Sequence, residues 1–171
     1  MSDSPSEYLY RADLRRSHEL SFDLMCYGST LFPAFDGTLS TTIAIVIRKL
    51  TEFAPAARRI LHLEQPCVEI REKLLTTNPR YKTEGHRYPY VAIPVIWALN
   101  GIIHAKDIWV NHLRDSENQA WQPNGAFHLI GFGFETDQRR VEHVDLFAFA
   151  NGYLSRPGHY MNDFFERKGR G

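Results

Sequence analysis

The sequence is poor in cysteine and has no long apolar run. Its two cysteines, Cys26 and Cys67, cannot build a disulfide framework, and no Cys-x-x-Cys pair indicates a zinc or redox site. The longest apolar candidate, residues 91–99, is much shorter than the roughly 18 residues that a membrane-spanning helix needs. The first residues are polar and acidic, unlike a secretory signal. We therefore expect a cytoplasmic protein without membrane association.

Neither sign of charge is in excess. Lys and Arg number 20, Asp and Glu also number 20, and the formal net charge is zero. Proteins dedicated to nucleic acid usually carry a basic excess, because phosphate contacts supply most of their affinity. The basic groups of this chain, such as Arg139-Arg140, have acidic neighbours such as Glu142, so nucleic acid is a less expected partner. A net charge near zero does little to oppose self-association, which favours a homo-oligomer.

The common catalytic and nucleotide-binding motifs are absent. The sequence has no Gly-x-Gly-x-x-Gly, no phosphate loop ending in Gly-Lys-Ser/Thr, no Gly-x-Ser-x-Gly, no His-Glu-x-x-His and no EF-hand pattern. These absences exclude the large classes that depend on those motifs, and we expect no cofactor. They leave other kinds of catalysis open.

The composition that is present, 43% hydrophobic and 13% aromatic, is typical of a globular domain. We expect a single domain over residues 1–171, with a short N-terminal arm at 1–6 and a C-terminal tail at 157–171. No repeat, low-complexity tract or linker divides the chain.

The N-terminal part predicts a helix and then a strand. Ser4, Pro5 and Glu7 form a capping box that begins a helix, which we expect to end near Arg16. Apolar and polar residues alternate over 19–26, and this period of two predicts a strand.

Residues 39–63 predict an amphipathic helix, because apolar residues recur at intervals of three and four. Pro55 is expected to kink this helix or split it in two. A further helix is expected from Pro66 to Asn78, followed by a polar loop over 80–87.

The C-terminal half predicts two β-hairpins. Asn100-Gly101 lies between two β-rich runs, 90–99 and 102–112, and is expected to form a type I′ turn. A second hairpin is expected to pair 126–136 with 141–151. The predicted fold class is therefore α+β: an N-terminal helix and strand, two to three helices, and a mainly antiparallel sheet of at least four strands. The sheet is expected to be curved or cone-like and covered by helices.

His143 and Asp145 are the best candidates for acid–base chemistry. Two residues apart on a strand, they share one face, which the expected register places with the aromatic Phe132 and Phe134. A histidine beside a carboxylate in an apolar hollow can serve as a general base. The structural alternatives are a hydrogen-bonded pair at the solvent rim of the sheet and a polar pair in an interface. No two histidines are spaced closely enough in the sequence to indicate a metal site.

His104 and Lys106 are the second set of candidate site residues. They fall on the otherwise apolar face of the first expected hairpin. A lysine there must either line a cavity or reach solvent along its aliphatic stem.

Two classes of function are compatible with these patterns. The first is a binding or assembly protein that acts as a homo-oligomer or as a subunit of a complex with another protein. The second is a small-molecule enzyme of the isomerase, dehydratase or hydrolase type that uses His143 and Asp145, with His104 or Lys106 opposite. A cavity lined by the His143–Asp145 pair favours the enzyme, and an exposed aromatic face favours the partner protein.

Overall fold

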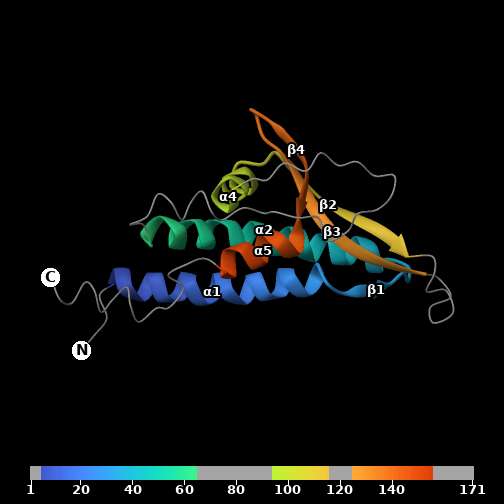
Figure 1. Cartoon of the computed structure of the whole chain (residues 1–171), viewed down its shortest axis with the longest axis horizontal. Coiled ribbons are helices and arrows are strands. Elements are labelled where there is room, and N and C mark those ends of the chain that lie inside the picture. The colour runs from blue at the N-terminus through green and yellow to red at the C-terminus, as the bar shows by residue number, and fades with distance from the viewer. Residues whose placement is uncertain (1–4, 65–93, 116–124, 156–171) are drawn as a thin grey trace.

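The computed structural model describes residues 5–64, 94–115 and 125–155. Within them, four helices and an open, four-stranded antiparallel sheet confirm the α+β class, with a helix and then a strand at the N-terminal end (Figure 1). The elements are α1 (Pro5–Tyr27), β1 (Leu31–Pro33), α2 (Thr38–Leu63), α4 (Val95–Ile103), β2 (Asp107–Asp115), β3 (Ala126–Glu135), β4 (Arg140–Asp145) and α5 (Leu146–Leu154). No helix among these is long and apolar enough to cross a membrane.

The two long helices, α1 and α2, lie side by side and antiparallel (Figure 1). Ion pairs link the two helices: Arg59 of α2 binds Asp13 of α1 through two contacts of 2.6 Å, and Lys49 of α2 binds Asp23 of α1 at 2.5 Å. The short helix α5 packs against α1, so the three helices share one apolar core.

The helix predicted from Pro5 is confirmed, but the strand predicted over 19–26 is wrong, because α1 continues to Tyr27. Leu20 and Leu24 are buried on the inner face of α1, whereas Phe22 is 61% exposed on the outer face. Residues two apart lie about 200° apart around a helix, so apolar residues on two opposite faces imitate the alternation of a strand. The first strand comes later, at Leu31–Pro33.

The helix predicted over 39–63 is confirmed as α2, which is a single helix of 26 residues. It runs through Pro55 as one helix, so of the two expected effects of Pro55, a kink or a split, the split does not occur. Neighbouring Phe53, Ala54 and Ala56 are buried, and their packing compensates for the hydrogen bond that proline cannot donate.

The hairpin predicted at Asn100-Gly101 is also wrong, because both residues lie inside α4. Val95, Leu99 and Ile102 are buried, and their spacing of four and three residues is that of a helix face. Gly101 does not have a positive φ. Glycine is instead required there because Phe134 packs against the helix: a Cβ atom on residue 101 would lie 2.2 Å from the Phe134 ring.

The second predicted hairpin is confirmed as β3 and β4, with β3 in the middle of the sheet. Its second strand is shorter than the predicted 141–151, because the chain enters α5 at Leu146. The carboxylate of Asp145 accepts a hydrogen bond of 2.6 Å from the Ala148 N–H and thereby caps the new helix. The helix predicted from Pro66, the loop over 80–87 and the tail at 157–171 lie outside the described residues.

Candidate functional site

His143 does not share a face with Phe132 and Phe134, so that expectation is wrong. Phe132 pairs with Val144 and Phe134 pairs with Val141, so β4 has one extra residue at this point. Such a bulge reverses the alternation of side chains and turns His143 to the opposite face of the sheet. There its ring lies over Gly131, since a Cβ atom on Gly131 would come within 2.3 Å of His143 Cε1.

The environment of His143 favours the neutral form of its ring. Asn111 Nδ2 lies 3.0 Å from His143 Nδ1 and donates a second hydrogen bond of 2.9 Å to the Glu142 carbonyl oxygen. With Nδ1 as an acceptor, the ring proton is on Nε2. Burial lowers the pKa of His143 below its ordinary value, and the nearby Asp145 carboxylate opposes this shift less strongly.

His104 and Lys106 lie elsewhere, beside the turn that joins β3 to β4. His104 is the C-terminal cap of α4, and Lys106 follows it in the link to β2. Lys106 forms an ion pair with Asp137 of the turn. The structure therefore divides the four predicted residues between two places: His143 and Asp145 at the end of β4, and His104 and Lys106 beside the turn.

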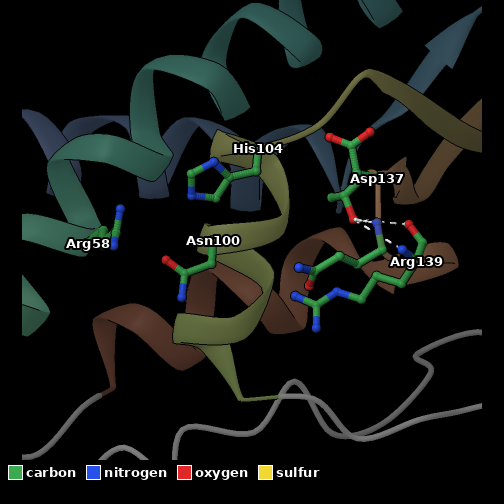
Figure 2. A pocket seen from close by; sticks show the side chains of 7 residues that line it. Arg58, Asn100, His104, Asp137 and Arg139 are labelled. Atoms are coloured by element: carbon green, nitrogen blue, oxygen red, sulfur yellow. Dashed lines mark hydrogen bonds between the residues drawn. The ribbon is translucent and has the colours of Figure 1, made fainter.

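His104 lines a cavity of about 440 Å³ between α2, α4 and the β3–β4 turn. Figure 2 shows Arg58 approaching from α2, Asn100 and His104 from α4, and Arg139 from the turn. The Cζ atom of the Arg139 guanidinium lies over the Trp97 ring, 3.3 Å from its centre. No local spacing in the sequence points to Arg58, Asn100 or Arg139, because three segments distant in the chain form this cavity.

A second feature is the outer face of α1, where six exposed residues form one stripe. Tyr8 is 68% exposed and Phe22 is 61% exposed, which is unusual for large apolar side chains. The members of the outer stripe are Tyr8, Ala12, Arg15, Glu19, Phe22 and Cys26. A groove lined by Tyr8, Ala12 and their neighbours runs along its N-terminal half.

No protein-family model, curated protein or solved structure matches this chain. Within residues 5–64, 94–115 and 125–155, no group of three or more His, Cys, Asp or Glu side chains could hold a metal ion. The cavity and the outer stripe are therefore the two features that bear on the function.

Proposed function

We propose that this protein is a binding protein that works as a homodimer, joined by antiparallel packing of α1 against α1 of a second copy. The observation that carries the proposal is the outer stripe. Its members are spaced by alternate intervals of four and three residues, which is the repeat of helices that pack along their whole length at about 20°.

The outer stripe is complementary to itself about a two-fold axis level with Ser17. In that arrangement Tyr8 faces Cys26 of the other copy, and Ala12 faces Phe22. A large side chain therefore meets a small one in both apolar layers, as efficient packing requires.

The central layer of this arrangement would pair opposite charges. Arg15 would face Glu19 of the other copy, and the same pair would recur by symmetry. These side chains are 84% and 52% exposed, and they already contact each other within one helix at 3.1 Å. A parallel arrangement would place Arg15 against Arg15, so the charges also select the antiparallel orientation.

The fold supports the proposal by fixing the rotation of α1. On its inner face, the Ser17 hydroxyl lies 2.7 Å from the Tyr153 hydroxyl, and the Ser21 hydroxyl donates to the Ala150 carbonyl at 2.8 Å. Both serines are fully buried. A helix held in this way presents its outer stripe already ordered, which lowers the entropy cost of association.

The enzyme alternative has less support. Asp145 is engaged as the cap of α5, and His143 lies on the outer face of the sheet beside Asn111. Neither residue lines the cavity that contains His104.

Disulfide cross-linking tests the proposed pairing. In a Cys67→Ser background, Tyr8→Cys should place a new thiol opposite Cys26 of the second copy, within the separation that a disulfide can bridge. Mild oxidation should then give a covalent dimer. The control is Thr51→Cys, at an exposed position of α2 outside the stripe, which should remain uncross-linked. Equal cross-linking of both variants, or none in either, would contradict the proposal.

A further inference from the structure

The cavity beside the β3–β4 turn carries unbalanced positive charge. Among the described residues, no carboxylate pairs with the guanidinium of Arg58 or Arg139. The acidic residue of the lining, Asp137, is already neutralised by Lys106. Figure 2 shows the Asp137 carboxylate pointing away from the Arg139 guanidinium. The cavity therefore has two positive charges without a counter-charge from the described residues.

Arg139 is held in a geometry suited to an oxyanion. Trp97 covers one face of its guanidinium, which leaves the in-plane N–H groups available. The turn that bears Arg139 is fixed by its own hydrogen bonds: Thr136 N–H donates to the Arg139 carbonyl at 2.8 Å, and Arg139 N–H donates to the Thr136 hydroxyl at 3.2 Å. Burial without an anion lowers the pKa of Arg139, which is the cost that a bound anion would remove.

Asn100 adds a second, independent indication of a ligand. Its Oδ1 atom is buried and has no hydrogen-bond partner among the described residues. A buried acceptor left without a donor is unfavourable, and a rotation of the amide toward the cavity would let a donor of a ligand satisfy it. The amide projects from α4 on the side of the cavity that Arg58 approaches (Figure 2).

We propose that this cavity binds a small phosphate ester that also carries a hydroxyl group. A phosphate monoester has a charge close to −2 at neutral pH, which offsets the two uncompensated positive charges of the cavity better than a single carboxylate does. The hydroxyl group donates to Asn100 Oδ1. A volume of about 440 Å³ is in the range of small-molecule sites. This site is independent of the dimer contact on α1.

Isothermal titration with glycerol 3-phosphate, inorganic phosphate and glycerol tests the site. Glycerol 3-phosphate should bind saturably and more tightly than inorganic phosphate, whereas glycerol alone should not bind. Arg58→Gln and Arg139→Gln should each weaken binding by roughly tenfold or more, because each removes charge-assisted hydrogen bonds. Asn100→Ala should weaken the binding of glycerol 3-phosphate but not that of inorganic phosphate.

The matched control is Arg48→Gln, which removes an exposed arginine from the same helix about 15 Å from Arg58. It should leave binding unchanged, and circular dichroism melting should show that all four variants fold. Equal loss in Arg48→Gln would indicate non-specific charge attraction and overturn the site. If no saturable binding is seen with ligand up to about 10 mM, the site is overturned as well, because the Kd of a specific site is lower than that concentration.

Discussion

Phe22→Ser should weaken the α1 dimer without unfolding the protein. Phe22 is 61% exposed, so roughly 120 Å² of its side chain, out of about 200 Å², is available for burial by a second copy. If half of that area is buried, each ring contributes about 1.5 kcal/mol at roughly 25 cal/mol per Å². Two symmetric copies contribute about 3 kcal/mol, which corresponds to an approximately hundredfold rise in the Kd of the dimer.

The monomer should tolerate this change, because Phe22 is not part of the core and serine has a helix propensity close to that of phenylalanine. The assay is sedimentation equilibrium over a concentration series. The matched control is Phe35→Ser, which removes an equally exposed ring (56%) between β1 and α2. A Kd for Phe22→Ser within twofold of the wild type, or an equal effect of Phe35→Ser, would refute the reasoning.

Three further predictions concern the fold and the residues at the end of β4. Gly101→Ala should destabilise the protein by about 1–3 kcal/mol in urea unfolding, because the added Cβ would overlap the Phe134 ring; a more stable variant would show that α4 does not pack so closely. Burial lowers the pKa of His143, so the unfolded chain binds more protons near pH 6 and stability should fall as the pH drops below about 6.5. In His143→Gln the melting temperature should fall less as the pH drops. A pH profile equal to that of the wild type would contradict the lowered pKa of His143. Asp145→Ala should cost about 1 kcal/mol because the Ala148 N–H loses its cap, and Asp145→Asn should recover most of it; equal stability of the two variants would refute the capping role.

The sequence predicted best those elements whose apolar residues lie on one face. The helix α2 and the β3–β4 hairpin each have a single buried face, so one period dominates their pattern. The second half of α1 was misassigned because Phe22 and Cys26 are apolar on the outside while Leu20 and Leu24 are apolar on the inside. The residues that misled the prediction are thus members of the proposed contact surface, where local pattern and fold are expected to disagree.

The candidate sites were harder to predict than the fold. A bulge of one residue in β4 moved His143 to the other face of the sheet, and sequence alternation does not reveal such an insertion. Asn100-Gly101 has the composition of a turn, but Gly101 is needed for its close approach to Phe134. The cavity is lined by Arg58 and Arg139, which are distant in sequence and border one cavity only because of the fold.

Charge exchange between two variants tests the dimer most directly. Arg15→Glu alone would place Glu against Glu at both central contacts, and Glu19→Arg alone would place Arg against Arg, so each variant should be monomeric. An equimolar mixture should form heterodimers, because each Glu of one variant then faces an Arg of the other. Light scattering on the two variants and on their mixture should give monomer, monomer and dimer. A mixture that remains monomeric, or a single variant that dimerises as the wild type does, would contradict antiparallel pairing through α1.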